Sequence, residues 1–386
     1  MDTECSNQMK LLIYTSDNPL QQPQTGGDKR FEELAKYACR MFDADVCGEF
    51  SQGEAERAGL NCKYKINKGK NRLIKLPPVI STVFLNRKLI KRIKCENYDN
   101  IVVFDVPIAF PLCFNRTKNI VLLVRKDLIG YEEYSSVHRG LSKIIYYLAK
   151  IIMESVCLTR CKKVIVQCEY DKERLLNRHK IIKKKIKGKF CVQINNINPG
   201  WIVNNGEDDS SQNIINDRYF NVCFVGSFND RRKGQDLFLG AANRLNSVYD
   251  DIYFHVIGSG KESEKYKSNF AGDNTIFYGR LDNPGSIIRK CNLMVVPSYA
   301  DSCPNTVLEA LYLGVAVIGS RRGGIPEILV DENSLFDADI ESLLKKIVTL
   351  YKNKDALESM LEKQSIRAKE LTFNWSEKIM SLIDRE

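Results

Sequence analysis

Residues 297–329 read PSYADSCPNTVLEALYLGVAVIGSRRGGIPEIL, and this segment decides how the chain is interpreted. Two carboxylates, Asp301 and Glu309, lie on either side of a Pro-Asn-Thr turn that begins an apolar helix. The first N–H groups of a helix have no partner within it, so such an end attracts anions, phosphate above all. Glu309 lies about a turn and a half into the helix, where it can accept hydrogen bonds from a ribose attached to the same phosphate. We interpret the segment as a nucleoside-diphosphate site.

The rest of the segment helps to distinguish a nucleotide site from a purely structural role. Gly314 ends the helix, a short β-run follows at 315–319, and a second turn reads Gly-Gly-Ile-Pro-Glu at 323–327. The alternative is an ordinary β-α-β unit in which Glu309 is exposed on the helix and binds nothing. Two acidic residues at this spacing would not by themselves distinguish a nucleotide site from such a unit. The complete segment 297–329, with its second turn, favours the nucleotide site.

The segment resembles the donor-binding motif of the family 4 glycosyltransferases, which are retaining enzymes of the GT-B fold. That motif has two acidic residues with seven residues between them. Asp301 takes the first place, usually a glutamate, and reaches one methylene less toward the donor sugar; Glu309 takes the second. The resemblance implies donor contacts from Asp301, Pro304, Asn305, Thr306, Val307 and Glu309.

The composition is that of a soluble globular protein with room for two domains. The chain has 386 residues, of which 44% are hydrophobic and 27% charged. No apolar run approaches the roughly 18 residues of a membrane-spanning helix, and the first residues lack the basic and apolar regions of a signal peptide. The 13 cysteines are scattered, mostly within apolar runs, so we expect buried reduced thiols and a cytoplasmic location.

Positive charge is concentrated in the first half of the chain. Residues 1–200 contain 36 Lys and Arg against 21 Asp and Glu, a balance of +15. From the totals of 58 and 48, the remaining residues contain 22 and 27, a balance of −5. This asymmetry predicts an anionic partner for the first half, either a membrane face or a nucleic acid. The sequence contains no aromatic-rich ribonucleoprotein motif and no zinc finger, which argues against nucleic acid.

Apolar runs and helical patterns alternate along the chain, which predicts parallel sheets built from β-α units. We expect strands at 10–16, 101–106, 120–124 and 164–168, and then at 221–226, 252–258, 275–278, 293–296 and 315–318. With the resemblance, this alternation predicts an α/β GT-B fold, two doubly wound Rossmann-like domains facing each other across a cleft. The expected division is an acceptor-side domain at 1–200, a linker at 201–217, a nucleotide-sugar-binding domain at 218–372, and a helix at 373–386 that crosses back to the first domain.

A basic loop at 226–234, which we call the cation loop, follows the first strand of the second series. Family members are similar here, with a glycine, an arginine and a lysine-glycine pair whose cations bind the donor diphosphate. Lys233 and Gly234 match that pair, but Ser227 occupies the arginine position, so Arg231 or Arg232 must supply the second cation. Arginine can bind two phosphate oxygens at once, and lysine acts as a point charge. A solvated basic loop is the alternative. The predicted catalytic residues are Lys233, Asp301 and Arg232.

Turns that contain glycine complete the predicted donor site. The resemblance implies further contacts from Gly26, Gly27, Gly226, Gly258, Arg280 and Leu281. Gly26 and Gly27 match a glycine pair whose N–H groups approach the donor phosphate from the opposite wall, and only glycine lets backbone come so close. Arg280 matches a strand end that contacts the nucleotide base. A plain turn remains the alternative for the glycines.

The acceptor side of the site is less well predicted. Many family members have a histidine at the end of a middle strand of the first domain. The corresponding strand, 120–124, is followed by Arg125, Lys126 and Asp127, of which the last two are candidates for this side of the site. The three histidines of the chain lie elsewhere, and we expect His255 to be packed in the core.

A second basic stretch, 178–189, reads RHKIIKKKIKGK. Lysines interleaved with isoleucines can lie on an anionic membrane surface. The same pattern also fits a solvated connection between helices, and the sequence leaves both interpretations open.

The resemblance implies a retaining, metal-independent hexosyltransferase without a cofactor. It would transfer a sugar from a nucleoside-diphosphate sugar to a hydroxyl of a glycan or lipid-linked glycan, as in polysaccharide biosynthesis, with peripheral contact with an anionic membrane at its cytoplasmic face. The alternatives are a nucleotide-sugar epimerase or phosphorylase of the same fold, and a non-catalytic module that binds a nucleotide sugar or a membrane. Release of free nucleoside diphosphate separates an enzyme from such a module.

Overall fold

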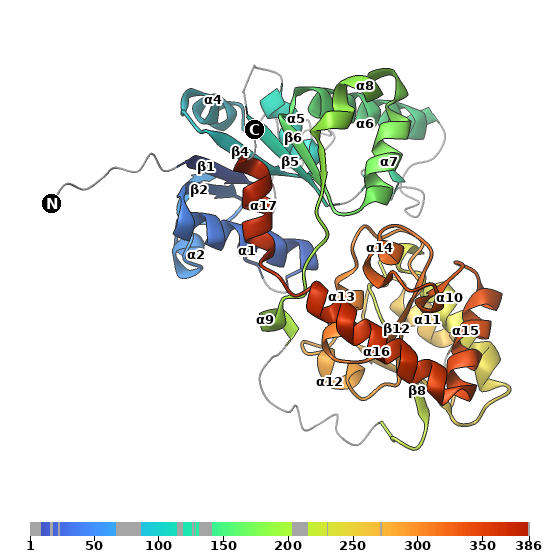
Figure 1. The fold of residues 1–386 in the computed structure, drawn as a ribbon. Helices are drawn as coiled ribbons and strands as arrows, with labels where there is room; N and C mark the ends of the chain where they lie inside the picture. The colour runs from blue at the N-terminus through green and yellow to red at the C-terminus, as the bar shows by residue number, and fades with distance from the viewer. Residues whose placement is uncertain are drawn as a thin grey trace.

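The protein consists of two α/β units, each built on a parallel sheet (Figure 1). The computed structural model describes residues 9–384 except 16–17, 22–23, 67–85, 114–118, 126, 128, 131–140, 203–214, 230 and 271. Lys126 and most of the predicted linker therefore lie outside the described residues. The first sheet has the strand order β3-β2-β1-β4-β5-β6-β7 and the second the order β10-β9-β8-β11-β12-β13. In each, the order reverses beside the first strand, as in a doubly wound fold.

The first unit lies between residues 10 and 202. Its strands are β1 (Lys10–Tyr14), β2 (Asp43–Gly48), β3 (Cys62–Lys65), β4 (Asn100–Phe104), β5 (Ile120–Val124), β6 (Lys163–Val166) and β7 (Phe190–Val192). Its helices are α1 (Gly26–Met41), α2 (Gln52–Arg57), α4 (Arg87–Cys95), α5 (Val106–Cys113), α6 (Leu141–Arg160), α7 (Glu169–Arg178), α8 (Lys183–Ile186) and α9 (Pro199–Ile202), with single turns η2 (Lys180–Ile182) and η3 (Lys187–Lys189) around α8.

The second unit begins at Phe220. Its strands are β8 (Phe220–Val225), β9 (Ile252–Ile257), β10 (Thr275–Gly279), β11 (Leu293–Val296), β12 (Ala316–Ser320) and β13 (Leu335–Phe336). Its helices are α10 (Gln235–Asn246), α11 (Ser263–Phe270), α12 (Gly285–Ile288), α13 (Asn305–Tyr312), α14 (Ile325–Leu329), α15 (Ile340–Lys352) and α16 (Lys354–Glu370), with single turns η5 (Arg231–Lys233) and η6 (Glu332–Ser334).

The last helix, α17 (Trp375–Asp384), belongs to the first unit in space although it follows the second in sequence (Figure 1). Its apolar side packs with α1 and α2 on one face of the first sheet, where Trp375, Ile379 and Ile383 are buried. The opposite face of that sheet is covered by α4, α5, α6 and α7. Two polypeptide crossings therefore connect the units.

Helices cover both faces of each sheet, so the side chains on both faces are apolar. The strands therefore appear in the sequence as continuous apolar runs. The strands expected from the sequence occur with shifted ends. The expected strand 101–106 is wrong at its end, since β4 stops at Phe104 and Asp105 adopts a left-handed conformation with φ 73° before α5 begins. The inner strand β2 and the edge strands β3, β7 and β13 were not predicted, because each offers only a few apolar residues.

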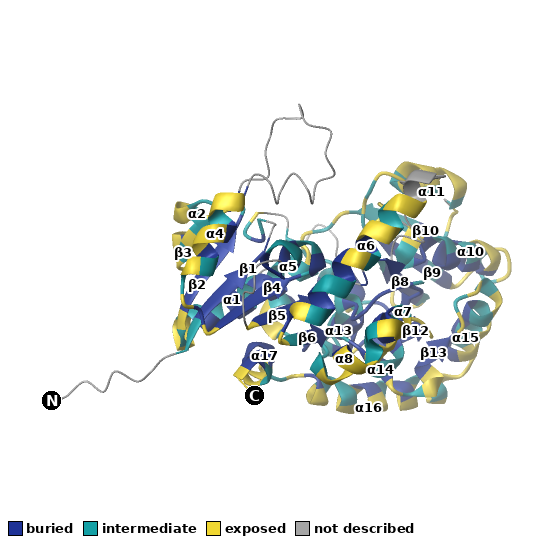
Figure 2. Ribbon diagram, turned by 90° about the horizontal axis from the view of Figure 1, so that it is seen from above, coloured by how far each residue is buried: buried dark blue, intermediate teal, exposed yellow. Residues whose placement is uncertain are grey.

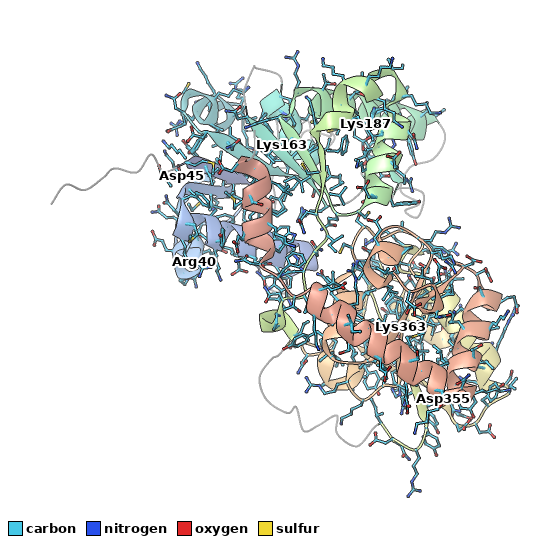
Figure 3. All side chains as sticks on the ribbon, in the orientation of Figure 1. Arg40, Asp45, Lys163, Lys187, Asp355 and Lys363 are labelled. Atoms are coloured by element: carbon cyan, nitrogen blue, oxygen red, sulfur yellow. The ribbon has the colours of Figure 1, made fainter. Side chains whose placement is uncertain are left out.

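The basic stretch 178–189 is not a uniformly solvated segment. Arg178 donates to Asp127 and Glu154 in the interior, His179 is buried, and Ile186 belongs to the first core. The exposed side chains are those of Lys180, Ile181, Lys184, Lys185 and Lys187. Lys187, labelled in Figure 3, lies on the side of the first unit away from the second.

The described cysteines are all free thiols, and most are buried, as expected. His255 is also buried as expected, with Nε2 2.9 Å from Asn221 Oδ1 and Nδ1 2.8 Å from the Tyr278 hydroxyl. Among the described helices, none combines the length and the apolar character that crossing a bilayer requires.

Candidate functional site

The strand order of the second sheet brings the cation loop and segment 297–329 together. The cation loop follows β8 and the segment follows β11, and these strands are neighbours where the order reverses. The Tyr299 N–H donates to Arg232 O at 2.9 Å, which joins the two loops. Gly234 has φ 71°, and a Cβ there would overlap the Pro297 carbonyl. A glycine is therefore required for this close approach.

Two of the three cations of the loop converge on Asp301. Lys233 Nζ lies 2.5 Å and Arg232 NH1 3.5 Å from Asp301 Oδ2. Burial by itself raises the pKa of Asp301, but Lys233 and Arg232 more than offset this effect, and the pKa lies below its ordinary value. Arg231 instead pairs with Asp236 at 2.5 Å and is 68% exposed, so the structure does not bring it to the other two.

The start of α13 lies next to this cluster. Pro304 precedes the helix and supplies no side-chain hydrogen bond to its first N–H groups. Asn305 Oδ1 is buried, and no described group donates a hydrogen bond to it. Val307 is fully buried in the second core, so only its backbone could contact a ligand, whereas Thr306 is half-buried. The helix start thus keeps N–H donors available for an anion, and Asn305 Oδ1 available to accept a hydrogen bond from a ligand hydroxyl.

Glu309 is half-buried one and a half turns into α13. Burial raises its pKa, while the neighbouring cations Lys29 and Lys233 oppose that rise. The structure gives this carboxylate no hydrogen-bond donor among the described residues. Lys29 comes from α1 of the first unit and was not predicted from the sequence, because nothing marks it among the many lysines of that half.

The first unit meets this site through the start of α1. A Cβ on Gly26 would overlap Asn305 Nδ2, and one on Gly27 would lie 2.8 Å from Arg125 NH1. Thr25 caps the helix by accepting from the Asp28 N–H. Gly26 therefore lies directly against the start of α13 and Gly27 against Arg125, and two helix N-termini meet at the boundary between the units.

Arg125 is a second residue that sequence reasoning missed. Its guanidinium donates to Asp105 Oδ2 through Nε at 3.0 Å and NH2 at 2.6 Å, and its backbone N–H donates to Asp105 Oδ1. The left-handed backbone at Asp105 turns that carboxylate toward the end of β5. Arg125 thus lies where the resemblance implies a histidine, and it presents NH1 to Gly27.

Further contacts hold the boundary between the units closed. Glu327 accepts hydrogen bonds from the N–H groups of Glu169 and Tyr170 at 2.8 and 3.0 Å, and so caps the start of α7 from the other unit. The Ser302 hydroxyl donates to Asp171, which is buried. Burial raises the pKa of Asp171 to about 6.

Arg30 joins α1 to both crossings between the units. It is buried, donates to the Asn196 carbonyl at 2.6 Å, and lies 4.3 Å from the centroid of the Trp201 ring and 5.4 Å from that of Trp375. Asn196 in turn donates to Phe373 O at 2.5 Å. This role of Arg30 could not be recognised from the sequence, because its contacts with Asn196, Trp201 and Trp375 span 166 or more residues.

The remaining predicted residues lie farther along the same edge of the second sheet. Gly258, with φ 138°, packs against the backbone of Gly226, and its N–H donates to Gly279 O at 2.7 Å. Arg280 is exposed after β10, two strands from β8, and Leu281 packs on the second core. Gly258, Arg280 and Leu281 thus lie along this edge of the sheet beyond the cation loop. Within the described residues, no three His, Cys, Asp or Glu side chains are grouped so as to hold a metal ion.

Comparison with known proteins identifies relatives of the second unit and of the whole fold. Residues 219–353 match the model of the family "Glycosyl transferases group 1". An uncharacterized glycosyltransferase of Methanocaldococcus jannaschii is 26% identical over 233 residues, which cover 58% of this chain and 59% of that protein. Matches to the first three curated relatives cover between 43% and 66% of their lengths.

Solved structures match nearly the whole chain. Sucrose-phosphate synthase from Thermosynechococcus elongatus superposes with a TM-score of 0.75 at 16% identity and covers 97% of this chain and 98% of its own. HepE of Anabaena, in complex with UDP and glucose, gives a TM-score of 0.73 at 15% identity over 98% and 100% of the two chains. The chain therefore has the GT-B fold of these glycosyltransferase structures, and its residues 219–353 match the group 1 glycosyl transferases.

Proposed function

We propose that this chain is a retaining family 4 glycosyltransferase. It transfers a hexose from a nucleoside-diphosphate sugar to a hydroxyl of a glycan or lipid-linked glycan. The observation that carries the proposal is the convergence of Lys233 and Arg232 beside the open start of α13, directly against the helix start at Gly26. Two cations and two helix N-termini favour a doubly charged diphosphate at this position.

In the proposed reaction the protein acts mainly on the leaving group. The bond between the sugar C1 and the phosphate oxygen breaks, and its electron pair moves to the diphosphate. Lys233, Arg232 and the N–H groups of α13 stabilise the charge that develops there, so no strong base is needed. In the free protein Lys233 pairs with Asp301, and the incoming diphosphate takes over part of this interaction.

The acceptor attacks from the same face of the sugar that the diphosphate leaves. The acceptor oxygen forms the new bond to C1, and its proton passes to the departing diphosphate, which retains the configuration. Asp301 accepts hydrogen bonds from the donor sugar, and Glu309 from the ribose hydroxyls. Arg125 and the start of α1 bound the site on the acceptor side.

We propose that the two cations provide the charge neutralisation that other transferases obtain from a metal ion, and that no cofactor takes part. Gly226, Gly258, Arg280 and Leu281 lie along the sheet edge where the nucleoside of a donor anchored at α13 would extend. Because HepE is bound to UDP and glucose, UDP-glucose is the first donor to test. We further propose that the acceptor belongs to polysaccharide or surface-glycan synthesis in the cytoplasm, in peripheral contact with an anionic membrane through the basic first unit.

The test combines binding and turnover on one panel of nucleoside-diphosphate sugars. A donor at a hundredfold its Kd should stabilise the protein by about 2.7 kcal/mol in thermal unfolding. The same donor with a glycan or lipid-linked acceptor should release free nucleoside diphosphate and give a product with the anomeric configuration of the donor. Stabilisation without release would instead identify a binding module. An inverted product would exclude the retaining mechanism, and an epimerised donor would identify an epimerase.

A further inference from the structure

The α6 helix carries an apolar surface that no other described element covers. Ile144, Ile145, Leu148 and Ile152 are each between 55% and 61% exposed, and Ala149 is exposed between them. At 100° per residue these positions lie on one side of the helix. We call them the α6 face. Soluble proteins rarely leave a contiguous apolar patch of this kind uncovered unless it binds something.

Positive charge lies on both sides of the α6 face, around the adjacent α8 on one side and on α4, beyond α5, on the other. The exposed cations are Arg87, Lys88, Lys91 and Arg92 on α4, and Lys180, Lys184, Lys185 and Lys187 around α8, next to the fully exposed Ile181. The stretches 87–95 and 180–189 contain no acidic residue, and the single carboxylate of α6, Glu154, is buried. One exposed carboxylate, that of Glu173 on α7, lies 3.9 Å from Lys183.

The cations and the apolar residues point in the same direction. The buried sides of α4, α6 and α8 all pack in the core on one face of the first sheet, so their exposed sides point away from that sheet together. Neighbouring contacts run from α4 to α5, from α5 to α6 and from α6 to α8. Figure 2 looks onto this side of the molecule, with exposed residues along α4, α6 and α8.

We propose that the α6 face and its flanking cations form a docking surface for an anionic lipid bilayer. The isoleucines and leucine enter the boundary between headgroups and acyl chains, while the lysines and arginines contact the headgroups. Charge complementarity favours an anionic bilayer over a second copy of the chain, because two copies of this surface would bring eight cations against eight. The α6 face also ends at a pocket lined by Cys113, Ser155, Val156, Thr159 and Arg160, which extends the apolar surface.

The position of this surface connects it to the proposed site. Helix α7 runs from the α8 region to Glu169, where Glu327 of the second unit caps it. Its ten residues span about 15 Å. A lipid-linked acceptor held in the bilayer therefore lies within reach of the boundary between the units. This consequence rests on the proposed transferase function, whereas the docking itself does not.

Vesicle co-sedimentation of the full chain, without donor, tests the docking. Wild type should bind phosphatidylglycerol-containing vesicles and not vesicles of phosphatidylcholine alone. An Ile144→Ser, Leu148→Ser, Ile152→Ser variant should bind at least tenfold more weakly. Ile366→Ser is the matched control, because Ile366 is 62% exposed on α16 of the second unit, and it should bind like wild type. Unchanged melting temperatures establish that the variants fold, and Ala149→Leu should strengthen binding severalfold.

The salt dependence of binding distinguishes the contribution of the cations from that of the apolar residues. A Lys184→Glu, Lys185→Glu variant should lose at least tenfold in binding at low salt, since each lysine near an anionic surface contributes about a fivefold factor. The difference should shrink near 1 M salt, where the Debye length falls to about 3 Å. Equal binding of wild type and the α6 variant, or equal binding to both lipids, would overturn the proposal. So would a wild-type dimer that the α6 variant converts to a monomer, because the α6 face would then be a subunit interface.

Discussion

The two sides of the candidate site are built in different ways. The side from the second unit consists of residues that lie close in sequence, namely the cation loop and segment 297–329. The side from the first unit consists of the start of α1 together with Arg125, Asp105 and Lys29, which are scattered over about a hundred residues. We therefore expect the contribution of the second unit to ligand binding to depend on individual charges. The contribution of the first unit should depend mainly on its shape.

The largest effect should come from Lys233. Lys233→Ala removes the cation closest to Asp301 and to the proposed leaving group. We expect kcat to fall about 10²–10³-fold, as when one donor of an oxyanion hole is lost, with a smaller change in KM. Steady-state kinetics with the best donor measures both constants. Arg231→Ala is the control, because Arg231 belongs to the same loop but pairs with Asp236, and it should keep near-normal kcat. Equal losses in the two variants would mean that general loop charge, and not the convergence on Asp301, supports the reaction.

Substitution of Glu309 should have a smaller effect, which weakens nucleotide binding but stabilises the folded protein at neutral pH. Glu309→Gln should weaken binding of donor and free nucleoside diphosphate alike by about 1.5–3 kcal/mol, since both contain the ribose. Calorimetry measures this change. Burial raises the folded-state pKa of Glu309, so its ionisation costs stability as pH rises from the unfolded pKa through the folded one. The variant should therefore melt at a higher temperature than wild type at neutral pH but not at pH 4. Unchanged nucleotide affinity would remove Glu309 from the site.

The smallest effect tests the side formed by the first unit. Gly26→Ala places a Cβ on Asn305 Nδ2, and the Asn305 side chain at the start of α13 must shift to make room. Displacements well below 1 Å can cost about tenfold in kcat/KM. Gly53→Ala is the matched control: Gly53 also lies in the first turn of a helix, but its Cβ would meet no atom within 4 Å. That substitution should leave activity unchanged and stabilise the protein by up to about 1 kcal/mol. Equal activity of the two variants would show that the helix starts need not touch.

Much of the fold could be predicted because its signals are local. Buried parallel strands leave continuous apolar runs, and the α13 helix begins at the predicted Pro-Asn-Thr turn. The inner strand β2 and the edge strands β3 and β7 could not be predicted in this way, since each contains only a few apolar residues. The basic stretch 178–189 was ambiguous for a related reason: its composition does not reveal that Arg178 and Ile186 are buried while Ile181 is exposed.

The sequence by itself determined the spacing of Asp301 and Glu309, the cations of the loop and the glycines that allow close backbone approach, because each depends on neighbours along the chain. Only the tertiary structure decided which cation meets Asp301, which arginine faces Gly27, and which side of α6 stays uncovered. These outcomes depend on pairs of residues far apart in sequence. Charge and polarity mark such residues as candidates, but the order of strands in the two sheets determines which of them meet.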